Sequence, residues 1–157
     1  MQKPTTIHST FVLERNYQAT PERVFAAFAD PAKKQNWFLG SGKNEVTHYE
    51  LEFREGGTER SGLILGPGTP VSGLTCTSDT LYQNIVANRR IVFASTMKIA
   101  GNCISAALVT VELLPAEAGT DLIVTHQAAF FEGADGPTMR EDGWRKLLES
   151  LAAELSA

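Results

Sequence analysis

Hydrophobic and polar residues alternate over the first part of this chain, as they do in a half-buried β-strand. Between residues 7 and 17, Phe11 and Leu13 fall on one side of an extended segment, while Val12 and Glu14 fall on the other. A period of two residues indicates a strand whose two faces meet different surroundings. The pattern therefore predicts a first strand over residues 7–17.

Two helix-start signals follow this strand. Thr20-Pro21 and Asp30-Pro31 each place a residue that favours the N-cap before a proline, which favours the first helical position. The first signal predicts a short helix, and the second predicts another that ends near Trp37.

Strand-like patterning returns near Thr47 and continues to Phe131. Glycine, proline and asparagine divide this stretch into shorter segments. We expect strands at residues 47–53, 58–65, 71–86, 91–99, 103–114 and 120–131. The connections between these segments are short, so neighbouring strands should pair antiparallel.

The last predicted element is a helix. Thr138, followed three residues later by Glu141, predicts a capping box at its start. The apolar residues that recur at helical spacing are Trp144, Leu147, Leu148, Leu151 and Leu155.

These elements predict an α+β fold with a curved antiparallel sheet of about seven strands. One helix is about 10 Å across, whereas seven strands span about 30 Å. A flat sheet would leave most of its apolar face uncovered, so the sheet should wrap around the long C-terminal helix. The two short helices after the first strand should close one end. Such a wrap can enclose a cavity between helix and sheet.

Composition narrows the class of protein. The 157 residues fit a single domain over 1–157, and with 43% hydrophobic and 20% charged residues they predict an ordinary globular chain. A formal net charge of −4 argues against a nucleic-acid partner. The first ten residues contain no apolar run, and the uncharged residues 61–78 contain several glycines and prolines. We therefore expect no membrane insertion and a cytoplasmic location.

Short segments along nearly the whole chain resemble a known family. They are Arg15–Phe25, Ala27–Pro31, Trp37-Phe38, Phe53–Gly57, Tyr82–Val86, Gly119–Leu122 and Gly143–Leu148. In this order they resemble the START-like, Bet v 1-like (SRPBCC) superfamily with its helix-grip fold. Within it, the chain is most similar to the family named for homology to the activator of the heat-shock-protein-90 ATPase.

The resemblance implies a hydrophobic ligand cavity under the last helix. The leading hypothesis is therefore a binding protein for a small apolar or amphipathic molecule, with no cofactor. The residues expected to contact the ligand are Trp37, Phe38, Leu51, Phe53, Leu63, Tyr82, Val109, Val124, His126, Trp144 and Leu148. The aromatic members have a simpler alternative role in core and helix packing.

Two residues could carry acid–base chemistry. His126 shares a strand face with Leu122 and Val124, so it should look into the enclosed space; its alternative is a core histidine with both nitrogens hydrogen-bonded. Glu59 shares a face with Leu63. On an inner face its pKa should rise, and at an open hairpin end it would be solvated.

The sequence is also compatible with two other functions. One is a cyclase- or hydrolase-type enzyme that uses Glu59 or His126 as acid or base. Another is an interaction domain that regulates a chaperone ATPase, which rests on the family name. The scattered histidines give no metal-ligand spacing, so no metal site is expected. Dimers through exposed sheet edges are common in such folds, so a homodimer is one expected form.

Overall fold

One antiparallel sheet and three helices make up the fold in the computed structural model, which describes residues 2–40 and 42–157. The strands are β1 (Ile7–Tyr17), β2 (Glu45–Leu51), β3 (Thr58–Ile64), β4 (Thr75–Val86), β5 (Arg90–Ile99), β6 (Asn102–Ala116) and β7 (Gly119–Phe130). The helices are α1 (Pro21–Ala29), α2 (Pro31–Phe38) and α3 (Pro137–Ser156). The seven strands lie in the order β1-β7-β6-β5-β4-β3-β2.

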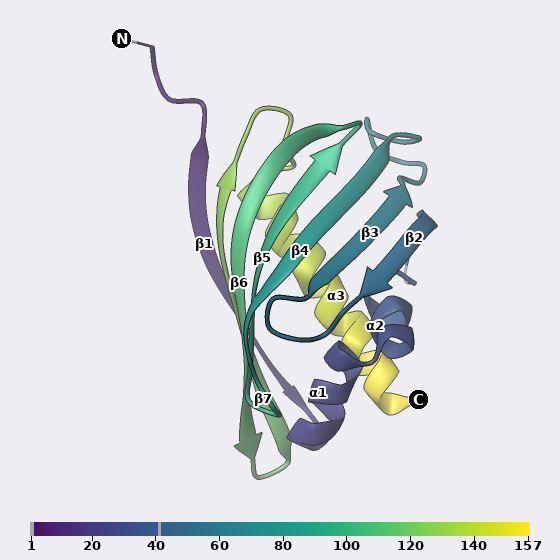
Figure 1. Cartoon of the computed structure of the whole chain (residues 1–157), viewed down its shortest axis with the longest axis vertical. Coiled ribbons are helices and arrows are strands. Elements are labelled where there is room, and N and C mark those ends of the chain that lie inside the picture. The colour runs from purple at the N-terminus through teal and green to yellow at the C-terminus, as the bar shows by residue number, and fades with distance from the viewer. Residues whose placement is uncertain (1, 41) are drawn as a thin grey trace.

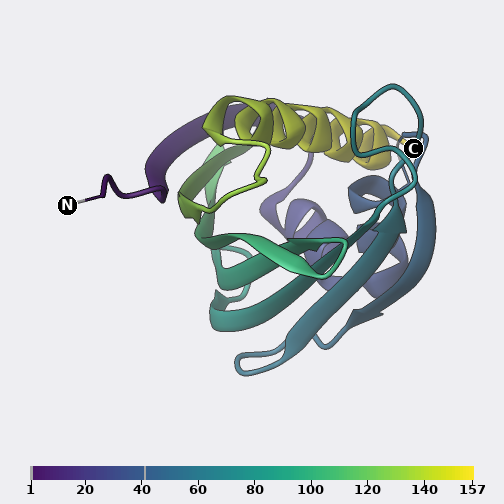
Figure 2. The ribbon, with the colours of Figure 1, turned by 90° about the horizontal axis from the view of Figure 1, so that it is seen from above.

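The sheet is strongly curved and α3 lies across its concave side (Figure 1). The short helices α1 and α2 lie beside the C-terminal half of α3, at one end of the sheet. Seen from above, the sheet bends into a U with α3 across the opening (Figure 2). The predicted α+β architecture, with a curved antiparallel sheet around a long C-terminal helix, is confirmed.

Local sequence signals explain where α1 and α2 begin. The hydroxyl oxygen of Thr20 accepts a hydrogen bond from the backbone N–H of Arg23 at 3.3 Å. The Asp30 carboxylate accepts from the N–H groups of Ala32 and Lys33, at 2.9 and 3.2 Å. Both N-caps were predicted, because a side-chain acceptor at this position satisfies amides that have no partner inside the helix.

The start of α3 differs from the prediction. The helix begins at Pro137, its N-cap is Gly136, and no side chain caps it. The predicted capping box of Thr138 and Glu141 was therefore wrong, because Thr138 already lies inside the first turn. Gly136 has φ 87° and ψ 169°, a conformation that other residues rarely adopt.

The fourth strand also begins later than expected, at Thr75 rather than residue 71. Residues 71–73 form part of a turn that closes back on the end of β3, since the N–H of Gly73 donates to the carbonyl of Leu65 at 2.8 Å. Gly73 has φ 82°, which favours glycine and ends the extended conformation there.

One half of the interior is solidly packed. Here α1, α2 and α3 contact one another, α1 packs on β6 and β7, and α3 packs on β1. Two hydrogen bonds join these elements: the Tyr17 hydroxyl donates to the Leu148 carbonyl, and the Trp37 indole donates to the Ala27 carbonyl, each at 2.8 Å. Buried apolar residues in this half include Leu13, Val24, Phe28, Val111, Leu113, Leu122, Val124 and Leu151.

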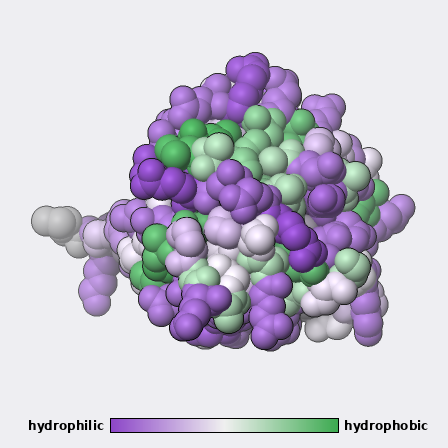
Figure 3. Space-filling view, turned by 90° about the horizontal axis from the view of Figure 1, so that it is seen from below, coloured by the Kyte–Doolittle hydropathy of each residue, from purple (hydrophilic) through white to green (hydrophobic). Residues whose placement is uncertain are grey.

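The outer surface is mixed in character. Viewed from below, hydrophilic and hydrophobic side chains are interspersed (Figure 3). Among the helices of the described residues, none is both long enough and apolar enough to span a bilayer.

Candidate ligand-binding cavity

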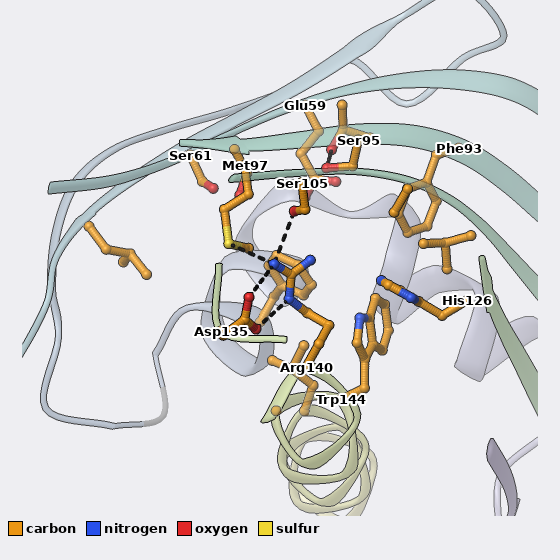
Figure 4. A pocket seen from close by; sticks show the side chains of 18 of the residues that line it. Glu59, Ser61, Phe93, Ser95, Met97, Ser105, His126, Asp135, Arg140 and Trp144 are labelled. Atoms are coloured by element: carbon orange, nitrogen blue, oxygen red, sulfur yellow. Dashed lines mark hydrogen bonds and ion pairs between the residues drawn. The ribbon is translucent and has the colours of Figure 1, made fainter. Parts of the chain in front are cut away.

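A cavity of about 380 Å³ lies between the concave face of the sheet and the first half of α3 (Figure 4). Its apolar lining consists of Phe38, Leu63, Phe93, Met97, Ala107, Val109, Met139, Trp144 and Leu147. Its polar lining includes Asn44, Glu59, Ser61, Ser78, Thr80, Ser95, Ser105, His126, Asp135, Arg140 and Lys146. The site is therefore largely apolar with polar groups at defined positions, which is typical of small-molecule sites.

The register of the strands explains why space remains here. Residues paired across antiparallel strands point to the same face. One row across the concave face carries large side chains: Phe11, His126, Val109, Phe93 and Tyr82. The next two rows carry mostly small ones: Glu59, Thr80, Ser95 and Ala107, then Ser61, Ser78, Met97 and Ser105. The short side chains in these two rows leave a space between the sheet and α3, and the long side chain of Arg140 crosses it to reach Ser105 and Met97.

Arg140 stands at the start of α3 and points toward the sheet (Figure 4). Its Nε and Nη2 atoms donate to the two carboxylate oxygens of Asp135, each at 2.8 Å, which makes a bidentate ion pair. Nη2 also donates to the hydroxyl of Ser105 at 3.0 Å and contacts the sulfur of Met97 at 3.5 Å. Arg140 is only 8% exposed, so this pair is a buried polar wall of the cavity.

Glu59 forms a second polar wall on β3, and it is 5% exposed. Its carboxylate accepts hydrogen bonds from Lys34 Nζ at 3.1 Å, from the Tyr49 hydroxyl at 2.6 Å and from the Tyr82 hydroxyl at 2.8 Å. Burial raises the pKa of a carboxyl, but the Lys34 charge and these donors outweigh it and hold the pKa of Glu59 below its ordinary value.

The predicted rise in the Glu59 pKa was therefore wrong. The physical reason is Lys34, an ammonium group on α2 that the fold brings against this carboxylate. Burial, together with the ionised Glu59, raises the pKa of both Tyr49 and Tyr82, so their hydroxyls stay protonated and donate. Glu59 is consequently ionised, accepts hydrogen bonds from all three donors, and cannot act as a proton donor.

His126 lies on β7 and is 2% exposed. Its ring stacks on Phe11 with 4.6 Å between centroids, and it meets the edge of Trp144 at 6.3 Å. Burial, and next the positive charge of Arg140, lower the pKa of His126 to about 4, so the ring is neutral near pH 7. Its Nδ1 atom is buried and has no hydrogen-bond partner among the described residues. The alternative of a core histidine with both nitrogens bonded therefore does not describe it.

The structure separates the expected ligand contacts into two groups. Those that line the cavity are Phe38, Leu63, Val109, His126 and Trp144, and Glu59 joins them. Those outside the lining are Trp37, Leu51, Phe53, Tyr82, Val124 and Leu148. Trp37, Val124 and Leu148 lie in the packed half, and Tyr82 is bonded to Glu59. Ligand contact by any of these residues stays a prediction.

The sequence patterns do not predict a role for the cavity residues Arg140, Asp135 and Ser105, or for Lys34, which pairs with Glu59 of the lining. Helical spacing was an available signal for two of them, since Arg140 precedes Trp144 by one turn. Lys34 similarly lies three residues before Trp37 and shares its helix face. No comparable signal marked Ser105 or Asp135, because their roles depend on which strand and loop meet the start of α3.

Comparisons with known proteins agree with this fold. Residues 18–156 match the family model described as activator of Hsp90 ATPase homolog 1-like protein. No curated protein matches the chain. A solved protein of Rhizobium loti is 44% identical, with 97% of this chain and 100% of that chain covered and a TM-score of 0.85. An uncharacterised protein of Rhizobium leguminosarum is 36% identical, with 96% of each chain covered and a TM-score of 0.88.

A more distant structure shares the fold alone. The AHSA1-like protein of Aeromonas hydrophila is 18% identical, with 94% of this chain and 92% of that chain covered and a TM-score of 0.70. The family model covers most of the sequence, and the resemblance inferred from short segments is confirmed. The chain belongs to the family of activator of Hsp90 ATPase homologue 1-like proteins.

Proposed function

We propose that this protein binds a small, mostly apolar molecule with a polar group in the cavity between α3 and the sheet. The observation that carries the proposal is the cavity of about 380 Å³, whose lining combines apolar side chains with buried polar ones such as Glu59, His126 and Arg140. Its volume falls within the range of roughly 300–1,000 Å³ that small-molecule sites occupy. Larger side chains at the serine and alanine positions of the sheet would fill this space and improve packing, so an unfilled interior favours a ligand-binding role.

The expected affinity is moderate. A ligand that buries about 300 Å² of apolar surface gains roughly 7 kcal/mol at about 25 cal/mol per Å². Loss of translational and rotational freedom opposes this gain, while hydrogen bonds to the cavity walls add to it. Dissociation constants in the micromolar range are therefore expected.

The electrostatics favour binding over acid catalysis by Glu59. A general acid must hold a proton near the working pH, whereas Glu59 is ionised and accepts from Lys34, Tyr49 and Tyr82. Regulation of a chaperone ATPase, which the family name suggests, stays a separate prediction that ATPase rates with and without this protein would test.

A matched pair of substitutions on β6 tests the proposal. Ala107 lies on the cavity side of the strand, while its neighbour Ala106 lies on the outer side. With N-phenyl-1-naphthylamine as a fluorescent probe, the unmodified protein should bind with a micromolar Kd. Ala107→Phe should fill the cavity and weaken binding at least about tenfold, whereas Ala106→Phe should leave the Kd within about twofold. Absence of binding, or equal loss in both variants, would contradict the proposal.

A further inference from the structure

Two residues that line the cavity, Arg140 and His126, each carry a nitrogen without a hydrogen-bond partner among the described residues. Arg140 has five N–H donors, and its Nε and Nη2 atoms bind Asp135, Ser105 and Met97. Its third nitrogen, Nη1, has no hydrogen-bond partner among the residues that the structure describes. His126 is the second group, since its ring is almost fully buried and its Nδ1 atom lacks a partner in that same part of the chain.

Arg140 on α3 and His126 on β7 both border the same cavity. Figure 4 shows the free guanidinium nitrogen of Arg140 turned away from Asp135 and toward the inside of the cavity, on the side of His126. The ring of His126 reaches into the same space from β7. Both side chains belong to the lining of the same cavity, together with Trp144.

The buried charges around this space cancel in pairs, while Lys146, which also lines the cavity, is exposed to solvent. Asp135 neutralises Arg140, and Lys34 neutralises Glu59 on the other wall. His126 carries no charge near pH 7. An anionic ligand at the buried end of the cavity would meet the Asp135 carboxylate without gaining an unpaired buried cation. The site is therefore suited to an uncharged ligand that supplies a hydrogen-bond acceptor.

We propose that Arg140 and His126 form a polar subsite for the carbonyl oxygen of an uncharged aromatic ligand. A carbonyl oxygen has two lone pairs, and it can accept one hydrogen bond from Arg140 Nη1 and one from the neutral imidazole. The imidazole can place its single proton on the nitrogen that faces the ligand. The rings of Trp144, Phe93 and Phe38 line the rest of the cavity and would pack against an aromatic body.

This inference rests on the proposed function and adds the class of ligand. It is tested with two probes of the same shape, 2-acetylnaphthalene and 2-ethylnaphthalene, which differ by a carbonyl group in place of a methylene. The unmodified protein should bind the ketone about tenfold more tightly, because the ketone gains hydrogen bonds that the hydrocarbon lacks. Binding is followed by titration calorimetry, and 2-naphthoate serves as an anionic comparison that should bind more weakly than the ketone.

Substitutions test whether His126 and Arg140 cause the preference for the ketone over the hydrocarbon. His126→Phe keeps an aromatic ring stacked on Phe11 and removes the imidazole, so it should cut the ketone preference to about threefold or less while 2-ethylnaphthalene still binds. The double variant Arg140→Met/Asp135→Asn removes both charges together and should likewise reduce the preference for the ketone to about threefold or less. His8→Phe and Arg145→Met are the controls: His8 is exposed, and Arg145 pairs with Glu141 on the outer side of α3. Both controls should keep the tenfold preference.

A second measurement remains informative if a variant fails to fold. The ring ¹⁵N resonances of His126 in the unmodified protein should shift when 2-acetylnaphthalene is added and stay nearly unchanged with 2-ethylnaphthalene. Equal binding of the two naphthalenes would overturn the subsite and leave the proposed function standing. Tighter binding of 2-naphthoate would overturn the uncharged ligand class. If N-phenyl-1-naphthylamine and both naphthalenes fail to bind, the proposed function falls as well.

Discussion

Lys34 and Glu59 form an ion pair in the wall of the cavity, and Arg140 and Asp135 form another at the start of α3. Each pair is neutral as a unit. A buried charge that loses its partner costs far more than the intact pair contributes, because water no longer solvates it. At the scale of the residue, each of these side chains is therefore retained largely because of its partner.

Removing one member of the Lys34–Glu59 pair should reveal this dependence. Lys34→Met should lower the free energy of unfolding by about 3–5 kcal/mol, since Glu59 would keep only its two tyrosine donors. The double variant Lys34→Met/Glu59→Gln should recover most of that loss. Urea unfolding at pH 7 measures both, and Arg54→Met, in an exposed pair with Glu52, should change stability by less than about 1 kcal/mol. A double variant as unstable as Lys34→Met alone would contradict the prediction.

His126 should make stability depend on pH. Its pKa falls from an ordinary 6.5 to about 4 in the folded protein, so between these values the unfolded chain binds a proton that the folded chain does not. Stability should therefore decrease as pH falls from 6.5 toward 4, by up to about 1.4 kcal/mol per pH unit. His126→Phe should reduce the difference in unfolding free energy between pH 7.5 and pH 5.

Two comparisons isolate this effect from other groups. His8→Phe, at an exposed position, should leave the pH dependence unchanged. Glu59 has a lowered pKa in the folded state, so its stabilising contribution is present above about pH 4.5 and is lost only as pH falls further. If His126→Phe shows the same dependence between pH 7.5 and pH 5 as the unmodified protein, the histidine is not its source.

At the scale of the element, α3 differs from α1 and α2 in how it begins. Side chains of Thr20 and Asp30 cap the two short helices. The start of α3 has no such cap, and Gly136 precedes it with a left-handed φ of 87°. Arg140 in the first turn instead ties this end of the helix to Asp135 and β6. Tertiary contacts therefore hold the start of α3, in place of a local capping signal.

Two glycine substitutions should have opposite effects on α3. Gly136→Ser introduces a residue that favours N-caps, yet it should destabilise the protein by about 1–3 kcal/mol because the backbone there suits only glycine. Gly143→Ala lies inside the helix, where an added Cβ meets no atom within 4 Å, and should stabilise by about 0.5–1 kcal/mol. Thermal unfolding measures both. A neutral or stabilising Gly136→Ser would show that the conformation is not required.

At the scale of the whole molecule, the interior is packed at one end and hollow at the other. Because one long helix cannot cover seven strands, the sequence predicts a hollow interior. In the structure α1, α2 and the second half of α3 fill one end. The cavity is confined to the other end, where the sheet presents small side chains to the first half of α3.

This asymmetry should appear in hydrogen exchange. Residues 141–146 of α3 include Gly143, Trp144 and Lys146, which line the cavity, whereas residues 149–153 include Leu151 and Ala152, which pack in the core. The first group should exchange faster, and N-phenyl-1-naphthylamine should slow that group selectively. Exchange read by mass spectrometry tests this expectation. Equal protection along α3, unchanged by the probe, would contradict it.

Local patterning was enough to predict the strands, the two capped helices and the inward-facing position of His126, whereas it left the surroundings of Glu59 open. These features follow from the alternation of side chains along a strand and from short-range capping, which act within a few residues. Of the expected ligand contacts, Phe38, Leu63, Val109 and Trp144 reach the cavity, while Trp37 and Leu148 complete the core instead.

The features of the site that the sequence did not predict depend on contacts between segments that are distant in the chain. Lys34 reverses the expected pKa shift of Glu59 although 25 positions separate them. Arg140 donates a hydrogen bond to Ser105, which lies 35 positions earlier in the sequence. The strand register brings the small side chains of neighbouring strands into common rows under α3. Such partnerships depend on how the sheet curves and where the helices dock, and the energy of a buried charge is set by those partners rather than by its neighbours in the chain.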